Sequence, residues 1–192
     1  AFAKLIYGED HPKGRFSIGT EESVSAITPD DLKSYYQDML STPVRMHVAG
    51  AVSQTRAEEA LSGVAALLSD EPLALPDYDI AEQDDEGKVY FIDVPGSKQS
   101  VLNIGTLIVP TGDPDFSKIR FANEKLGGGI SGDLAQVLRI EKGYTYGAYS
   151  WVSDGLEPQT FKAATSVRAN ATGPSLDVIK GMLEAYGPAF DE

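Results

Sequence analysis

The sequence contains no cysteine, only two histidines and a single tryptophan among its 192 residues. The absence of cysteine excludes disulfide bonds, thiolate nucleophiles and cysteine-ligated zinc. The two histidines, His11 and His47, lie far apart, and neither belongs to an H-x-x-E-H or H-E-x-x-H pattern typical of helical zinc sites. We therefore expect no metal ligands, no cofactor and no catalytic residues in this chain.

Long apolar runs and positive charge are also scarce. No stretch approaches the roughly 20 apolar residues of a membrane-spanning helix. The formal net charge is −13, whereas nucleic acids and anionic membranes attract clustered lysine and arginine. We expect neither nucleic acid as a partner nor a membrane span. The composition assigns no compartment, and the cell envelope, the periplasm and the cytoplasm all stay open.

Acidic residues are concentrated in one segment. Asp70–Glu86 holds eight acidic residues and no lysine or arginine. Such a block is typical of a solvated linker. The opening AFAKLIYGED has neither an initiator methionine nor a signal-peptide pattern and resembles the tail of a helix, which favours a piece of a longer protein.

Secondary structure is predicted from the spacing of apolar residues, which recur every three or four positions in helices and alternate in strands. A helix is expected after the cap Thr28-Pro29, and another from a capping box of Thr55 and Glu58. Further helices are predicted at 113–126, at 131–142 and from Pro174, and strands at 44–52, 88–94, 100–109, 146–153 and 160–168. Paired strands between paired helices predict an α+β fold, a two-layer sandwich with a mixed, mostly antiparallel sheet and helices on one face.

Glycines dominate the stretch LGGGISGDLAQVLRIEKGYTYGAYS, from Leu126 to Ser150. They contain the spacing G-x-G-x-x-G, but a dinucleotide site needs a strand directly before it, and the preceding residues predict a helix. Gly127 is instead expected to end that helix in the left-handed conformation, with Gly128 and Gly129 turning the chain. A cap alone and a cap that also binds another chain both remain open.

The same stretch resembles the non-catalytic lobe of insulinase/pitrilysin-type zinc peptidases, the group that includes mitochondrial processing peptidase. VYFIDVPGSKQSVLNIG and the later DPDF resemble the opening of that lobe, and YGEDHPKGRFSIGTEESVSAITPDDLKSYYQDML resembles the end of the catalytic lobe. The resemblance implies three parts: 1–75 closing the catalytic lobe, an acidic linker at 76–87, and 88–192 opening the non-catalytic lobe. One compact unit from about residue 44 is the other arrangement that stays open.

The resemblance also implies site residues. The family pattern L-R-x-E-K-x-x-x-Y falls on Leu138 to Tyr146, and it implies that Arg139 and Tyr146 bind the substrate backbone, with Tyr144 as the alternative tyrosine. The family's glycine loop falls on Gly127, Gly128 and Gly129, which are implied to contact substrate. Asp133 stands where the family often has a basic residue, which leaves the preferred substrate charge open.

The implied function is that of a substrate-binding, metal-free fragment of a zinc-dependent metalloendopeptidase, which hydrolyses peptide bonds. The fragment itself is expected to be inactive, because the zinc ligands would lie upstream in the parent protein or in a partner subunit. The implied partners are a peptide or unfolded polypeptide, with a catalytic lobe in cis or a catalytic subunit in trans. The alternative is a non-catalytic partner or scaffold subunit of a heteromeric peptidase.

Overall fold

The computed structural model describes residues 1–68, 78–80 and 87–187. The chain divides into two compact units, one up to residue 81 and one from residue 82, with Phe2 counted in the second. Most of the predicted linker at 76–87 lies outside the described residues, so the division into 1–75 and 88–192 stays a prediction. In the described ranges, none of the helices has the length and apolar character to cross a membrane.

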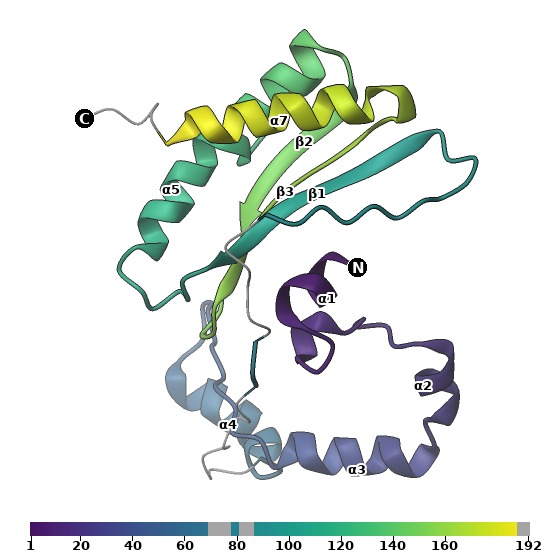
Figure 1. Cartoon of the computed structure of the whole chain (residues 1–192). Helices are drawn as coiled ribbons and strands as arrows, with labels where there is room; N and C mark the ends of the chain where they lie inside the picture. The colour runs from purple at the N-terminus through teal and green to yellow at the C-terminus, as the bar shows by residue number, and fades with distance from the viewer. Residues whose placement is uncertain (69–77, 81–86, 188–192) are drawn as a thin grey trace. The chain divides into compact units, whose positions relative to one another are not determined.

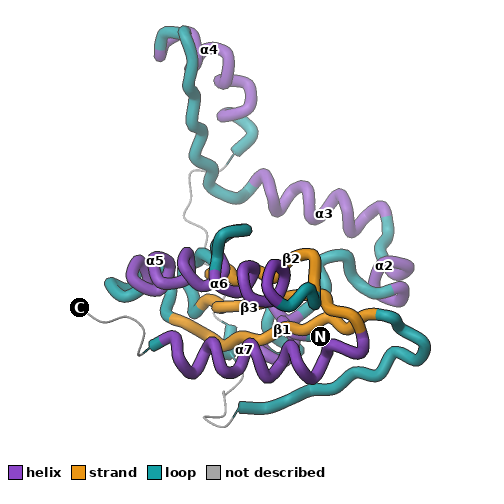
Figure 2. The backbone as a smooth tube through the Cα atoms, turned by 90° about the horizontal axis from the view of Figure 1, so that it is seen from above, coloured by secondary structure: helices purple, strands orange, loops and turns teal. Residues whose placement is uncertain are grey.

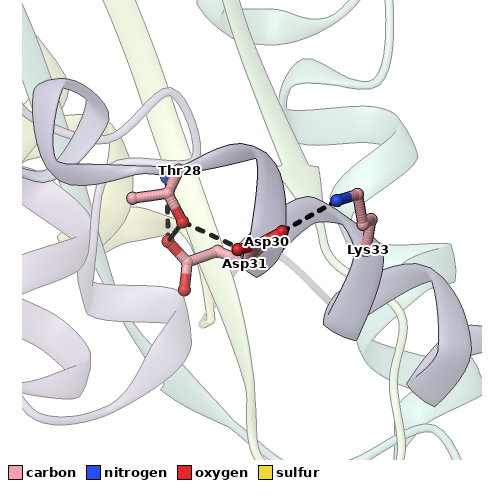
Figure 3. A network of polar contacts seen from close by, with 4 residues as sticks. All are labelled: Thr28, Asp30, Asp31 and Lys33. Atoms are coloured by element: carbon pink, nitrogen blue, oxygen red, sulfur yellow. Dashed lines mark hydrogen bonds and ion pairs between the residues drawn. The ribbon is translucent and has the colours of Figure 1, made fainter.

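The first unit is built from short helices joined by loops (Figure 1). They are α1 (Phe2–Tyr7), η1 (Pro12–Gly14), α2 (Glu21–Ala26), α3 (Pro29–Leu40) and α4 (Gln54–Ala65). The predicted start of α3 at Thr28-Pro29 is confirmed, and Figure 3 shows why it is stable. Thr28 Oγ1 accepts a hydrogen bond from Asp31 N at 3.2 Å, and Thr28 N donates to Asp31 Oδ2 at 2.8 Å. This reciprocal capping box satisfies two backbone donors and lowers the pKa of Asp31, because its carboxylate accepts the Thr28 hydrogen bonds.

The start of α4 differs from the prediction. Its N-cap is Ser53, whose hydroxyl accepts a hydrogen bond from Arg56 N at 3.4 Å, and the predicted capping box of Thr55 and Glu58 is wrong. A serine two residues earlier already caps the helix, so Thr55 lies inside its first turn.

The predicted strands at 44–52 and 88–94 belong to no sheet in the structure. Their alternation of apolar and polar residues is real, but Val44, Val48 and Phe91 are exposed. Alternation predicts a half-buried strand only when a neighbouring strand supplies hydrogen bonds and another layer covers its apolar face. Neither is provided by the described residues.

The second unit contains a three-stranded antiparallel sheet in the order β1-β3-β2. Its strands are β1 (Gln99–Ile108), β2 (Thr145–Val152) and β3 (Gln159–Arg168), within one residue of the predictions. Central β3 is paired on both sides, and Leu102 of β1 lies opposite Thr165 while Ala148 of β2 lies opposite the same residue.

Helices cover one face of this sheet. Figures 1 and 2 show α5 (Phe116–Gly127) and α7 (Thr172–Tyr186) on the same side of the strands, with the short α6 (Asp133–Ala135) beside α5. The core between the layers consists of Leu102, Leu126, Leu134, Leu138, Ala148, Ala163, Val167, Ala171 and Ile179. This arrangement confirms the predicted α+β fold with helices on one face of the sheet.

Candidate functional site

The glycine stretch connects α5 to α6 and lies against β2. The element before it is a helix, as predicted, so the strand that a dinucleotide site requires is missing. Gly127 is the last residue of α5 and is buried. None of Gly127, Gly128 and Gly129 has a positive φ, so the predicted left-handed cap at Gly127 is wrong.

Close packing explains the glycine at position 127 better than backbone conformation does. A Cβ placed there would lie 2.5 Å from both the backbone nitrogen and the Oγ of Ser150 on β2. Next to this contact, Asn123 Nδ2 donates a buried hydrogen bond of 3.2 Å to the Ser150 carbonyl. The end of α5 is thus fixed directly on the backbone of β2.

The rest of the loop is more open. Gly129 is half-buried, and a Cβ there would meet nothing within 4 Å, whereas Gly128 is exposed but a Cβ there would lie 2.8 Å from Glu124 Cα. The loop closes through Gly132 N, which donates to the Gly129 carbonyl at 3.0 Å. Among the three glycines that the resemblance assigns to substrate contact, Gly128 is exposed and Gly129 is half-buried, whereas Gly127 is buried against β2.

An ion pair closes the loop at its base. Lys125, in the last turn of α5, pairs with Asp133 at the start of α6. The hydrogen bond to Asp133 raises the pKa of Lys125. The charge of Asp133 is therefore compensated by Lys125. Nearby, Tyr186 at the end of α7 donates a hydrogen bond of 2.5 Å to the Ala122 carbonyl, and burial raises the pKa of its phenol.

The helix predicted at 131–142 is regular only at its start. Gln136 N donates to the Gly132 carbonyl at 3.0 Å, four residues back, as in an α-helix. The following segment, η2 (Gln136–Glu141), is π-helical, and Lys142 N donates to the Val137 carbonyl at 2.9 Å, five residues back. A π-turn is rare and holds one additional residue per turn.

Arg139 lies inside this π-helical turn. Its neighbour Leu138 is fully buried, whereas Arg139 is half-buried and Ile140 is exposed. Within the part of the chain that the structure describes, no hydrogen bond or ion pair occupies the Arg139 guanidinium. A guanidinium carries five donors in a fixed fork, so this group is equipped to bind a carbonyl or carboxylate.

The two candidate tyrosines occupy different environments. Tyr144 packs partly buried against the core, whereas Tyr146 is 92% exposed. Regular alternation would place both on one side of the strand, but a β-bulge shifts the register between Thr145 and Ala148. Thr145 Oγ1 donates to the Ser166 carbonyl at 2.7 Å, and Thr165 Oγ1 donates to the Gly147 carbonyl at 2.9 Å, which pins the bulge. The structure thus places Tyr146 in solvent and Tyr144 partly buried against the core.

Gly143 joins the turn to the strand. Its φ of +63° is in the left-handed region, which favours glycine, and Tyr144 N then donates to the Leu138 carbonyl at 2.9 Å. The turn around Gly143 therefore leads directly from the segment that carries Arg139 to the segment that carries Tyr146.

The described residues contain no candidate metal site. Nowhere among them do three or more histidine, cysteine, aspartate or glutamate side chains lie close enough to hold a metal ion. His11 is buried, stacked on Tyr7 with ring centroids 5.0 Å apart, and its Nδ1 accepts from Lys13 N. His47 is exposed. The described side chains therefore do not fit a zinc ion.

Comparisons with known proteins agree with this architecture. The family model described as the peptidase M16 inactive domain matches residues 26–186. An uncharacterized zinc protease of Streptomyces coelicolor is 27% identical over 191 residues, which cover 95% of this chain and 41% of that protein.

Solved structures give the same result. The peptidase M16 inactive domain from Pseudomonas fluorescens matches with a TM-score of 0.79 and 26% identity, over 96% of this chain and 44% of that one. A protease from Helicobacter pylori shares the fold with a TM-score of 0.72 and 18% identity, over 91% of this chain and 43% of that one. The chain spans less than half the length of these relatives. The resemblance noted in the sequence is confirmed, and the chain belongs to the M16 peptidase family, matching its inactive domain.

Proposed function

We propose that this chain is the substrate-binding, metal-free part of a zinc-dependent metalloendopeptidase. The observation that carries the proposal is that a half-buried guanidinium at Arg139, with no hydrogen bond or ion pair to the described residues, and an outward phenol at Tyr146 lie on either side of the turn at Gly143. Both groups donate hydrogen bonds, and backbone carbonyl oxygens of an extended polypeptide are the acceptors that they fit.

The two side chains have separate roles in this proposal. Arg139 holds a peptide carbonyl through charge-assisted hydrogen bonds, which fix the direction of the bound backbone. Tyr146 donates a hydrogen bond from its phenolic hydroxyl to an oxygen on which negative charge develops. Gly128 and Gly129 let the polypeptide approach the loop backbone closely, because neither carries a side chain. Gly127 acts indirectly, by holding the loop on β2.

Zinc belongs to the parent protein or to a partner subunit in this proposal, because the described side chains do not fit it. The relative from Streptomyces coelicolor is described as a zinc protease, which supports zinc in the family. The bound partner is a peptide or an unfolded polypeptide, and the catalytic lobe acts in cis or as a separate subunit.

The experiment is steady-state proteolysis by the complete protein carrying Arg139→Ala or Tyr146→Phe. Loss of one such donor is expected to lower kcat/KM on the order of 10²-fold. Arg120→Ala and Tyr149→Phe are the matched controls, since Arg120 pairs with Asp154 on the surface and Tyr149 lies further along β2. Unchanged kinetics in both test variants would remove the assigned roles.

A further inference from the structure

We propose that two one-residue irregularities, the π-helical turn η2 and the bulge in β2, position Arg139 and Tyr146 for the same bound polypeptide. The inference rests on the proposed function of these two residues. It assigns the role of positioning them to the backbone of the turn and of the bulge. The decisive element is the additional residue in η2, which lies between the two groups.

Backbone hydrogen bonds locate that residue. Lys142 N reaches the Val137 carbonyl five residues back, where an α-helix would reach four. The backbone hydrogen bond that ends the helix after Gly143 also spans one residue more than usual. Tyr144 N donates to Leu138, six residues back, where the usual glycine-ended helix closes over five. Both bonds enclose Arg139 and Ile140, so removal of one residue there would restore both regular spacings.

The side chains show what the additional residue changes. In a continued α-helix, Glu141 and Lys142 would lie three and four residues after Leu138 and share its core-facing side. In the structure both are exposed, and Tyr144 supplies the next contact with the core. The turn therefore lets the chain leave the core directly after Leu138, which keeps the Arg139 guanidinium accessible rather than burying charged groups.

The bulge in β2 likewise keeps the side chain of Tyr146 exposed. Tyr146 is two residues before Ala148, which is fully buried, and regular alternation would turn the phenol toward the core. The register shift between Thr145 and Ala148 removes that relation and leaves Tyr146 in solvent. Irregular helix turns and bulges recur at functional sites. Here the two irregularities lie close together in the chain, the turn at Gln136–Glu141 and the register shift between Thr145 and Ala148.

Deletion of Ile140 tests the inference in the complete protein. Ile140 is exposed, and its removal converts the Lys142–Val137 bond to the α-helical spacing. One helical residue corresponds to about 1.5 Å along the axis and about 100° around it, so Arg139 would be displaced relative to Tyr146. Ile140→Ala is the matched control, since it removes the same side chain but keeps the backbone residue.

The readout is the Kd of fluorescein-labelled β-casein, an unstructured polypeptide, measured with a chelator present so that no cleavage occurs. We expect the deletion to weaken binding about tenfold or more, as Arg139→Ala does, and Ile140→Ala to change it by about twofold at most. Adding Arg139→Ala to the deletion is expected to cause no further loss, because the guanidinium is already misplaced.

The outcomes separate the two proposals. If Arg139→Ala leaves binding unchanged, the proposed function of Arg139 fails. If Arg139→Ala weakens binding but a folded deletion variant binds like the wild type, the positioning role of the turn is refuted. Should the deletion variant not fold, a structure of the complete wild-type protein with bound peptide decides. The inference is supported if the Lys142–Val137 bond is retained and Arg139 contacts the peptide. It is overturned if the turn converts to an α-helix on binding.

Discussion

Replacement of Gly127 by alanine tests whether close packing, rather than backbone conformation, selects glycine at the end of α5. The new Cβ would lie 2.5 Å from Ser150 N, whereas ordinary contacts begin at 3.4 Å, so α5 and β2 must separate by about 0.9 Å. The 3.2 Å hydrogen bond from Asn123 to the Ser150 carbonyl spans the same gap and would be lost.

The magnitude follows from three contributions. Overpacking costs about 1–3 kcal/mol, and loss of the Asn123 hydrogen bond adds about 1 kcal/mol. The better helix propensity of alanine returns at most about 1 kcal/mol, and less at the last residue of a helix. We therefore expect Gly127→Ala to destabilise the contact between α5 and β2 by about 1–4 kcal/mol.

Gly129→Ala is the matched control within the same loop. A Cβ there meets nothing within 4 Å, and the φ of Gly129 is not positive, so we expect unchanged or slightly higher stability, by up to about 1 kcal/mol. The assay is native-state amide hydrogen exchange of α5 and β2 in the complete protein. Equal protection of both variants would refute the packing argument. In the proposed function, Gly129→Ala nevertheless weakens casein binding, because a methyl group covers the exposed loop backbone.

Two further predictions concern ionisable groups and caps. Lys125 and Tyr186 both have a raised pKa in the folded protein. Their contribution to stability is therefore complete at neutral pH and is lost as the pH rises through the folded-state values, so hydrogen-exchange protection of α5 and α7 should fall above about pH 10 and not between pH 7 and 9. Tyr186→Phe should remove the tyrosine part of that fall, and an unchanged profile would contradict the assignment. Thr28→Ala should lower the free energy of local opening at the start of α3 by about 1 kcal/mol. Ser41→Ala, beyond the opposite end of the helix, should leave the exchange of the N-terminal amides unchanged. Because Thr28 lowers the pKa of Asp31, the contribution of the Asp31 carboxylate to the cap is present above about pH 4 and lost as the pH falls through the folded-state pKa, and a titration of Asp31 by NMR checks this sign.

Much of the second unit is predictable because its pattern and its packing agree. Alternation along 100–109 and 160–168 predicts β1 and β3, and the helical spacing of Phe116, Ile119 and Leu126 predicts α5. These segments find partners within the described chain, so the apolar faces that the pattern indicates are buried.

Prediction from the sequence fails where the local structure depends on contacts with distant segments of the chain. The segments 44–52 and 88–94 alternate like strands, but no described strand pairs with them. The π-turn had a signal in the sequence, since Glu141 and Lys142 break the apolar spacing set by Leu134 and Leu138. The bulge had none, because a register shift is decided by the pairing of β2 with β3 and by the hydroxyls of Thr145 and Thr165.

The candidate site was predictable as a set of residues but not as a geometry. Arg139, Tyr146 and the glycines follow from the resemblance, whereas the exposure of Tyr146 and the burial of Gly127 follow only from the bulge and the α5–β2 contact. The difference in exposure between Tyr144 and Tyr146 depends on the same bulge, and for this reason the proposed function assigns ligand contact to Tyr146.

The alternative role, a non-catalytic partner subunit, uses the same binding residues in trans. The two roles differ in where the zinc ligands lie. An H-x-x-E-H motif in the parent protein would favour the peptidase, and its absence there would favour the partner subunit.

The central claim is that polypeptide binds at Tyr146, and photo-crosslinking measures this most directly. A benzophenone amino acid replaces Tyr146 in the complete protein, which is irradiated with labelled β-casein in the presence of a chelator. Leu156, exposed beyond the opposite end of β2, carries the same group as the control. The account predicts a casein adduct from position 146 that excess unlabelled casein suppresses, and no comparable adduct from position 156. Equal labelling from both positions, or none from position 146, would contradict it.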